Sequence, residues 1–470
     1  MGTLPILSPN LIVVVVLSFL SIISSLCLAL TSHEAADIAR RQLLSFEQHG
    51  NHVHIDINIE IRVTNPRLLA AHRALQAIKR ALHSDPSNFT ANWSGPDVCA
   101  YNGVLCAPSP DNASASAVAS LDMNGADVAG YLPKEIGLLS DLAVLHLNSN
   151  RFCGVIPDEI TQMKRLYELD VSNNRLVGAF PVAVLRVPGL VYLDLRFNGF
   201  EGPIPPELFL KPNLDAIFLN NNRFTDGIPD TIGESAASVI VLANNDLGGC
   251  VPASIGRAAA TLDEILLINN SLAGCLPVES GLLGNVTVFD VSRNLIAGSV
   301  PDTMGGLAKV ERLDLSYNLF TGIVPRDVCV LPALANLSVS HNFFVGEDNE
   351  CSGGGRIDKV FEDEGNCMGN ARPLQRSGGE CAPVVSRPMN CSNTKPCGWP
   401  APAPEKKLAP KRAEHSPPPP AMVMSPPPPA AISPPPPVVS PPPPIYETVV
   451  LPPIFATKYQ SPPPPLFAGY

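Results

Sequence analysis

Hydrophobic residues recur at a period of about 24 residues through the middle of the chain. The stretch "LYELDVSNNRLVGAFP" (residues 166–181) returns as "LVYLDLRFNGFEGPIP" (residues 190–205) and as "VERLDLSYNLFTGIVP" (residues 310–325). Each copy opens with apolar residues that alternate with other residues, which predicts a short strand. An asparagine and a Gly-containing return segment follow, so the period predicts a stack of similar units.

The shared pattern, L-x-x-L-x-L-x-x-N-x-L-x-G-x-I-P, is that of a leucine-rich repeat. Its asparagines are Asn150, Asn174, Asn198, Asn222, Asn245, Asn270, Asn294, Asn318 and Asn342, and a degenerate first copy has Ala126 in the same slot. One repeat cannot bury its leucines alone, whereas a stack builds a continuous core and a curved parallel sheet. We therefore expect an α/β solenoid, a horseshoe of about ten repeats over residues 118–346. The asparagines should bind backbone groups as a ladder through the stack.

Both ends of such a core need caps, which we place at residues 30–117 and 347–400. Residues 53–63, "VHIDINIEIRV", predict an edge strand, and residues 65–86 follow a helical pattern. A Cys99–Cys106 bridge would close the loop over the first end of the core. At the rear of the stack, five cysteines follow with little periodicity: Cys351, Cys367, Cys381, Cys391 and Cys397. They predict a disulfide-stapled cap and hinge, and the alternative is a zinc site.

The two termini differ in composition from the repeats. The apolar run "LIVVVVLSFLSIISSLCLAL" (residues 11–30) predicts a secretory signal over residues 1–29, cleaved after Ala29, with a membrane anchor as the alternative. Residues 401–470 carry serines that each precede four prolines: Ser416, Ser425, Ser433, Ser440 and Ser461. Proline lacks a backbone donor and fixes φ, so this tail is expected to be disordered polyproline II. A passive linker is the alternative reading of the tail.

Cysteines, sequons and charge indicate the compartment and the partners. Eleven of the 12 cysteines lie beyond the predicted signal. The N-x-S/T sequons are Asn88, Asn92, Asn112, Asn269, Asn285, Asn336 and Asn390. Both features indicate an oxidising, glycosylating compartment outside the cell. The net charge is −11, and the tail holds five Lys/Arg against three Glu, so residues 1–400 carry −13. An acidic body argues against nucleic acid and favours basic partners.

Cysteine spacing suggests specific pairs. Cys250 and Cys275 each lie five residues after a repeat asparagine. Equivalent positions in neighbouring repeats should stack about 4.8 Å apart, within the roughly 4.4–6.8 Å that a disulfide accepts, so we expect a Cys250–Cys275 bridge. Cys329 then completes an even set with the five cap cysteines. Cys153 is left over, either as a partly buried free thiol or as a bridge to a second chain.

The combination of these modules resembles a known family. Repeats ending in G-x-I-P look like the plant-specific class, and S-P-P-P-P blocks look like extensins of plant cell walls. Joined by a cysteine-rich hinge, and with stretches such as "SDPSNFTANWSGPDVCAYNGVLCAPSP" and "YLDLRFNGFEG", they resemble the leucine-rich repeat extensin family.

The resemblance implies a wall-anchored, non-enzymatic protein. Its repeat domain would bind basic, cysteine-rich peptides of the rapid alkalinisation factor type, and its tail would be glycosylated and attached to the wall. The family is also associated with pectin organisation, growth control and disulfide-linked homodimers. The Tyr-x-Tyr cross-link motif of extensins is absent here, and Tyr446, Tyr459 and Tyr470 could couple singly.

No residues form a recognisable catalytic set. The sequence has no G-x-S-x-G, H-E-x-x-H or kinase signature, and we expect neither an enzyme nor a cofactor. His52 and His54 could form a metal pair, but a solvated strand face is the favoured interpretation.

A binding face is predicted instead. Strand residues between the buried leucines should point to the concave side of the horseshoe. The acids at these positions are Asp122, Glu168, Asp170, Asp194, Asp215, Asp263, Glu264, Asp290, Glu311 and Asp314. The only basic residues at these positions are Arg196, Arg293 and Arg312. The aromatic residues there are Tyr167, Tyr192, Phe197, Phe218 and Tyr317. Acids that steer and aromatics that anchor suit a basic peptide.

Other interpretations of this face stay open. The aspartates of the L-D-L slot could be solvated filler, and a glycan on Asn269 could obstruct part of the face. The repeats could also bind pectin directly, or inhibit polygalacturonases.

Overall fold

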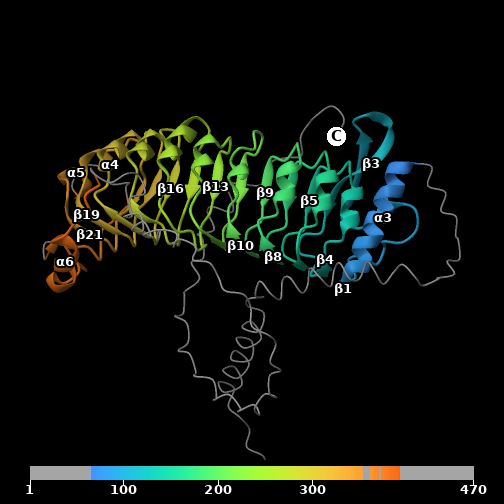
Figure 1. Ribbon diagram of the computed structural model, residues 1–470, viewed down its shortest axis with the longest axis horizontal. Helices are drawn as coiled ribbons and strands as arrows, with labels where there is room; N and C mark the ends of the chain where they lie inside the picture. The colour runs from blue at the N-terminus through green and yellow to red at the C-terminus, as the bar shows by residue number, and fades with distance from the viewer. Residues whose placement is uncertain (1–64, 353–359, 370–371, 392–470) are drawn as a thin grey trace, which may run out of the picture.

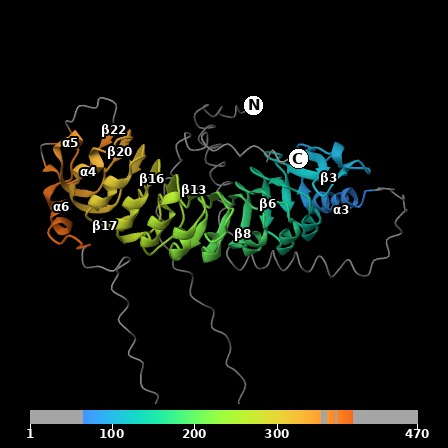
Figure 2. The same ribbon diagram turned by 90° about the horizontal axis from the view of Figure 1, so that it is seen from above.

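The computed structural model describes residues 65–352, 360–369 and 372–391, which form a curved stack of repeats (Figure 1). The predicted signal, the strand over residues 53–63, His52, His54, Cys397 and the proline-rich tail lie outside the described residues. Figure 2 shows the stack bending into an arc, with β13 and β16 on the inner side of the curve. The solenoid that the period predicts is confirmed.

The inner side of the arc is one sheet of 12 described strands, and all its neighbouring pairs are parallel except β2 with β3. In order across the sheet these are β2 (Val104–Ser109), β3 (Asn112–Asp122), β5 (Val144–His146), β7 (Glu168–Asp170), β9 (Tyr192–Asp194), β11 (Ala216–Phe218), β13 (Val239–Val241), β14 (Glu264–Leu266), β16 (Val288–Asp290), β18 (Arg312–Asp314), β20 (Asn336–Ser338) and β22 (Val360–Glu362). Most strands are three residues long because a 24-residue repeat must also include turns and the segment that leads back to the next inner strand.

Two further sheets form mainly from the segments that follow the asparagine slots of the repeats. The first contains β1 (Leu82–Ser84), β4 (Ala129–Tyr131), β6 (Arg151–Gly154), β8 (Arg175–Ala179), β10 (Gly199–Pro203) and β12 (Arg223–Thr225). It begins with β1 of the N-terminal cap, which pairs antiparallel with β4. The second contains β15 (Ala273–Cys275), β17 (Leu295–Gly298), β19 (Leu319–Val324) and β21 (Phe343–Glu347). Short helices complete the repeats: η3 (Lys134–Leu138), η4 (Asp158–Gln162), η5 (Val182–Arg186), η6 (Pro206–Leu208), η7 (Asp230–Glu234), η8 (Ala253–Ala260), η9 (Val278–Leu282), η10 (Asp302–Gly306) and α4 (Arg326–Cys329).

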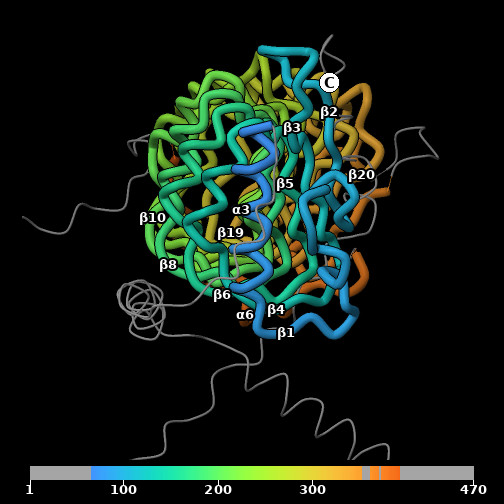
Figure 3. Tube along the Cα trace, turned by 90° about the vertical axis from the view of Figure 1, so that its right-hand side faces the viewer, coloured from blue at the N-terminus to red at the C-terminus, as the bar shows by residue number. Residues whose placement is uncertain are grey.

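The helix α3 (Pro66–Ala81) covers the first end of the stack, as Figure 3 shows from that end. It starts where Asn65 accepts a hydrogen bond from the Arg67 amide at 3.0 Å and Pro66 takes the first helical position, where a missing N–H costs nothing. Its buried residues Ala71, Ala74, Leu75 and Ile78 follow the helical period and belong to the main core. The buried Trp93 stacks on Tyr101 behind it, and Cys99 is joined to Cys106 as expected.

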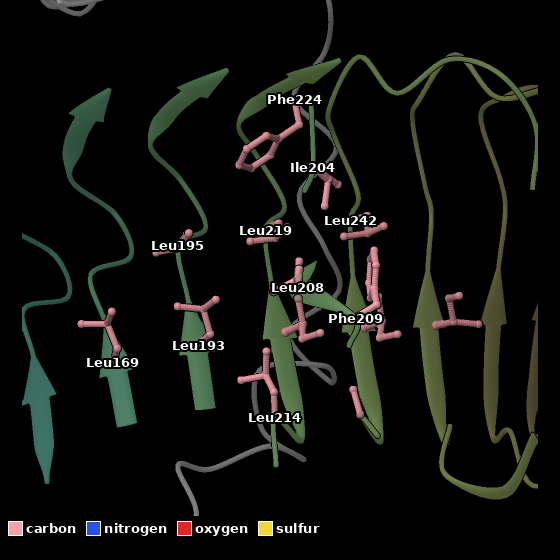
Figure 4. Packing of buried hydrophobic residues seen from close by; sticks show 14 of the residues in the cluster. Leu169, Leu193, Leu195, Ile204, Leu208, Phe209, Leu214, Leu219, Phe224 and Leu242 are labelled. Atoms are coloured by element: carbon pink, nitrogen blue, oxygen red, sulfur yellow. The ribbon is translucent and has the colours of Figure 1, made fainter. Parts of the chain in front are cut away.

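The core is a continuous column of leucines and phenylalanines between the sheets (Figure 4). Leu169 and Leu193 come from the middle of neighbouring inner strands, and Leu195, Leu219 and Leu242 follow the strands at equivalent places. Each repeat thus buries the leucines of the repeats before and after it. The apolar period of the sequence is the period of this column.

The repeat asparagines form the expected ladder. Asn318 is typical: its Oδ1 accepts from the Ile296 amide at 3.0 Å, and its Nδ2 donates to the Val291 carbonyl of the preceding repeat at 2.9 Å. The same Nδ2 also donates to Leu315 and Ser316 of its own turn. The ladder runs one step beyond the repeats counted from the sequence, because Asn366 accepts from the Phe344 amide at 3.1 Å and donates to Val339.

The predicted Cys250–Cys275 bridge is wrong. Cys275 is joined to Cys391, with 5.8 Å between their Cα atoms, and Cys250 is disulfide-bonded elsewhere. After the asparagine, neighbouring strands are staggered by two residues: Cys275 lies beside Ala297, and Ala273 lies beside Leu295. Equivalent positions are therefore about 8 Å apart, from roughly 4.8 Å across the strands and 6.6 Å along them, which exceeds the ~7 Å limit for a disulfide.

The rear of the stack is closed by disulfides. Cys329 is bonded to Cys351 beside the short helix α5 (Asn349–Ser352), and Cys367 to Cys381 in α6 (Gly378–Val385). With Cys391 bonded to Cys275, the six rear cysteines are not the closed even set that the sequence suggested. These bonds also exclude the zinc alternative for the four cap cysteines within the described range.

Replacing Asn318 by alanine should lower the free energy of unfolding by about 2–4 kcal/mol, because it leaves a buried amide and a buried carbonyl of the preceding repeat without partners. Urea denaturation measures the change. The exposed Asn213→Ala is the control and should stay within about 0.5 kcal/mol of the wild type. A loss below 1 kcal/mol at Asn318 would mean that the ladder does not stabilise the stack.

Peptide mapping of the unreduced, secreted chain should yield a fragment that joins Cys275 to Cys391. A fragment that joins Cys250 to Cys275 would show that the two-residue stagger between repeats is not present in solution.

Candidate functional site

The candidate site is the inner face of the 12-stranded sheet, formed by the side chains that flank the core-facing residue of each strand. The middle residue of each short strand, such as Leu193 or Ile217, belongs to the main core. Since side chains alternate along a strand, its two neighbours lie on the opposite face. The strand register aligns these neighbours in two rows across the sheet.

The first inner row contains Ser120, Val144, Glu168, Tyr192, Ala216, Val239, Glu264, Val288, Arg312, Asn336 and Val360. The second inner row contains Asp122, His146, Asp170, Asp194, Phe218, Val241, Leu266, Asp290, Asp314, Ser338 and Glu362. The second row changes from acidic to apolar and back to acidic along the stack.

The apolar centre is a second hydrophobic cluster, separate from the main core. It consists of closely packed residues that are each at most 6% exposed: Tyr192, Ala216, Phe218, Val239, Val241, Ala243, Leu266, Ile268 and Val288. The Tyr192 and Phe218 rings contact each other with centroids 5.5 Å apart, and the Arg196 guanidinium lies 5.2 Å from the Phe218 centroid. The sequence interpretation picked out the two aromatics and missed the aliphatics, although both kinds of residue occupy the same slots.

The acids on the N-terminal side of the apolar centre are engaged with polar neighbours. Glu168 is within 3.0 Å of the His146 ring, and this carboxylate raises the pKa of His146 although burial opposes the shift. Asp194 contacts the Arg196 guanidinium at 2.9 Å and accepts from the Tyr192 hydroxyl at 3.3 Å. Burial, with Asp170 on the next strand, raises the pKa of Asp194 to about 7.

The acids on the C-terminal side form a similar pair. Arg312 lies between Asp290 and Asp314, with its Nη2 at 3.8 Å and 3.5 Å from their carboxylate oxygens. Burial and the neighbouring Asp314 charge raise the pKa of Asp290. One arginine therefore serves two carboxylates on adjacent strands.

The predicted site residues divide by exposure. Glu168, Asp170, Asp194 and Asp290 face the inner side but are buried, so the interpretation of the L-D-L aspartates as solvated filler fails for Asp170, Asp194 and Asp290. The more accessible members are Tyr167, Asp215, Asp263, Glu264, Glu311 and Asp314. Direct contact with a ligand is thus open mainly to the second set.

A third set lies at the rim, where residues with positive φ stand three positions after the end of an inner strand. These residues include Phe197, Arg293, Tyr317 and His341, in a backbone region that bulky side chains rarely adopt. The Arg293 guanidinium lies 4.3 Å from the Tyr317 ring centroid, and Tyr317 stacks on His341 at 4.1 Å. Phe197 and Tyr317 are 48% and 41% exposed, so the rim presents aromatic surface to a ligand.

The Cys153 thiol is free and half-buried, burial raises its pKa, and its Sγ donates to the Gly130 carbonyl at 3.3 Å. Among the described residues, no cluster of histidine, cysteine or carboxylate side chains could hold a metal ion. Within the same ranges, no helix has the length and apolar character needed to cross a bilayer.

Because burial raises the pKa of Asp194, we expect the free energy of unfolding to fall as the pH rises. Asp194 holds its proton up to about pH 7 in the folded chain, against a usual value of 3.8. The folded state therefore binds more protons than the unfolded state between about pH 4 and pH 7, so the free energy of unfolding falls as the pH rises through this window.

We expect a lower Tm at pH 7.5 than at pH 5 and a smaller difference in Asp194→Asn, which removes the titrating group. The exposed Asp263→Asn on the same face should keep the wild-type difference. A variant Asp194→Asn with an unchanged pH dependence of Tm would contradict the assignment.

Comparison with known proteins places the fold in its family context. The chain matches the family models described as leucine rich repeat at residues 141–163, 189–210 and 284–344, and as leucine rich repeat N-terminal domain at residues 72–107. The Arabidopsis receptor kinase HAESA ectodomain, solved with a peptide hormone ligand, is similar at 25% identity and a TM-score of 0.55, over 64% of this chain and 50% of that chain. A plant ice-binding protein is similar at 28% identity and a TM-score of 0.51, over 60% and 87%. Proteins that share this fold therefore differ in function.

Two relatives from Arabidopsis thaliana define the family. Leucine-rich repeat extensin-like protein 2 is 53% identical over 51% of this chain, and the match spans only 30% of that protein's length. Leucine-rich repeat extensin-like protein 6 is 61% identical over 332 residues, which cover 70% of this chain and 69% of that protein. The chain belongs to the leucine-rich repeat extensin-like family.

Proposed function

We propose that the inner face binds a small, basic, cysteine-rich signalling peptide of the rapid alkalinisation factor type, while the proline-rich tail holds the protein in the cell wall. In this role the protein is a secreted scaffold rather than a catalyst, and it takes part in the control of wall formation and cell growth. Family membership and the chemistry of the inner face support the proposal.

The observation that carries the proposal is the acidic–apolar–acidic order of the second inner row. Asp194 and Asp290 stand on β9 and β16, four strand steps apart, which is about 19 Å at 4.8 Å a step. Between them lie Phe218, Val241 and Leu266. A peptide with an apolar patch between basic groups complements this order, since apolar centres anchor a partner and charged surroundings steer it.

The charge balance of the face supports a basic partner. Arg312 lies between the carboxylates of Asp290 and Asp314, so this pair keeps a net negative charge when both acids are ionised, whereas Arg196 contacts the single carboxylate of Asp194. Asp263 and Glu311 add exposed carboxylates at the start of two further strands. The solved HAESA ectodomain, with its peptide hormone, offers a precedent for a peptide as the ligand of this fold.

Other partners belong to the same proposal. The wall-attached tail would contact pectin. A disulfide-linked homodimer would require Cys153, or another cysteine, to bond to a cysteine of a second chain. Affinity capture from wall extracts with the full mature chain separates the possible ligands. Recovery of a basic peptide supports the proposal, whereas recovery of only polysaccharide or only a polygalacturonase would replace it.

Reversing one exposed charge of the inner face should weaken peptide binding. We expect Asp263→Lys to raise the Kd for a rapid alkalinisation factor-type peptide roughly fivefold, about 1 kcal/mol, mostly through slower association at low salt. The matched control is Glu207→Lys in η6, which makes the same change of net charge at an exposed site away from the inner strands. Surface plasmon resonance measures both, and equal Kd values for the two variants would remove the inner face as the site.

A further inference from the structure

The sequons of the described residues differ in where they lie on the stack. Asn336 is the first residue of β20 and occupies the first inner row, between Arg312 and Val360 of the neighbouring strands. Its side chain is exposed. Among the sequon asparagines in the described ranges, it alone belongs to the two inner rows.

Other sequon asparagines are placed differently. Asn269 is part-buried and donates its Nδ2 to Asn244 at 2.9 Å, so a sugar there would break an inter-repeat hydrogen bond. Asn92 donates its Nδ2 to the Ala100 carbonyl at 2.8 Å within the N-terminal cap. Asn285 is exposed and donates its Nδ2 to the carbonyl of Ala259 in η8, away from the inner strands. Asn336 thus combines an accessible amide with a position on the proposed ligand face.

A small pocket of about 200 Å³ lies at the same place. Its lining comes from β18, β20 and β22 and includes Arg312, Asp314, Asn336, Ser338, Val360 and Glu362. Asp314 and Glu362 outnumber Arg312, which is already shared with the buried Asp290. Its surroundings are therefore acidic, and a basic side chain of a ligand would be attracted to it.

We propose that an N-linked glycan on Asn336 covers this acidic pocket and limits the ligand face to the strands before β18. An N-linked glycan is bulky and hydrated, and it would leave from a side chain that lines the pocket. Without the sugar, the pocket becomes an additional contact for a cationic side chain. The effect on ligand binding rests on the proposed function, whereas the covering of the pocket does not.

The covering is tested without any ligand. In full-length protein secreted from plant cells, glycopeptide mass spectrometry should find a glycan on Asn336, and an unmodified Asn336 overturns the proposal. A thiol is then placed beside the pocket as Val360→Cys, at a position that is 52% exposed, in a Cys153→Ser background that removes the free thiol of the described ranges. Labelling by a maleimide-linked polymer should be at least fivefold faster when Asn336→Gln is added.

Matched controls keep the labelling test decisive. Asn285→Gln removes a sugar from the outer side and should leave the labelling rate unchanged. Enzymatic removal of glycans from the folded protein replaces the Asn336→Gln variant if that variant is poorly secreted, and it should give the same acceleration. Equal labelling rates with and without the Asn336 sugar overturn the proposal.

Peptide binding separates this inference from the proposed function. Asn336→Gln should bind a rapid alkalinisation factor-type peptide about threefold more tightly than the wild type, and the further change Glu362→Gln should reverse the gain. If labelling accelerates but none of the variants binds the peptide, the covering stands and the proposed function fails. If the wild type binds and Asn336→Gln binds with the same Kd, the limit placed on the ligand face is wrong.

Discussion

The buried asparagine ladder is the interaction on which the rest of this structure depends. Turns between short strands leave backbone amides and carbonyls inside the stack, and such groups are costly when they lack partners. An asparagine side chain satisfies both kinds of group at once, as Asn318 does for Ile296 and Val291 of the preceding repeat. Because the ladder fixes each repeat against the one before it, strand residues fall into straight rows on the inner face.

The rows have a consequence for the chemistry of the face. Side chains from residues 24 positions apart become neighbours on adjacent strands, so like charges such as Asp290 and Asp314 are brought side by side. Burial and this proximity raise the pKa of Asp290, and the shared Arg312 limits the repulsion. Where apolar residues fill the same slots, they form a cluster outside the core. The alternation of these zones gives an otherwise repetitive surface a defined order along the stack.

Sequence reasoning reached the fold because the apolar period and the asparagine slots follow from local rules. It could not place Cys275 correctly, because the two-residue stagger between strands after the asparagine is set by packing of neighbouring repeats. It missed the last rung of the asparagine ladder, Asn366, because Phe361 and Asp363 replace the leucines that precede the asparagine in most other repeats. At the site, it found the acids but not their burial, and it passed over Val241 and Leu266 because apolar residues in strands are usually assigned to the core.

The central claim is that a peptide lies on the inner strands, over the apolar centre and its acidic neighbours. Hydrogen–deuterium exchange of the full mature chain, with and without a saturating rapid alkalinisation factor-type peptide, tests it most directly. We expect slower exchange in segments that contain β9 through β16, with the short η helices of the same repeats unchanged. Protection confined to the η helices or to the caps would contradict the claim.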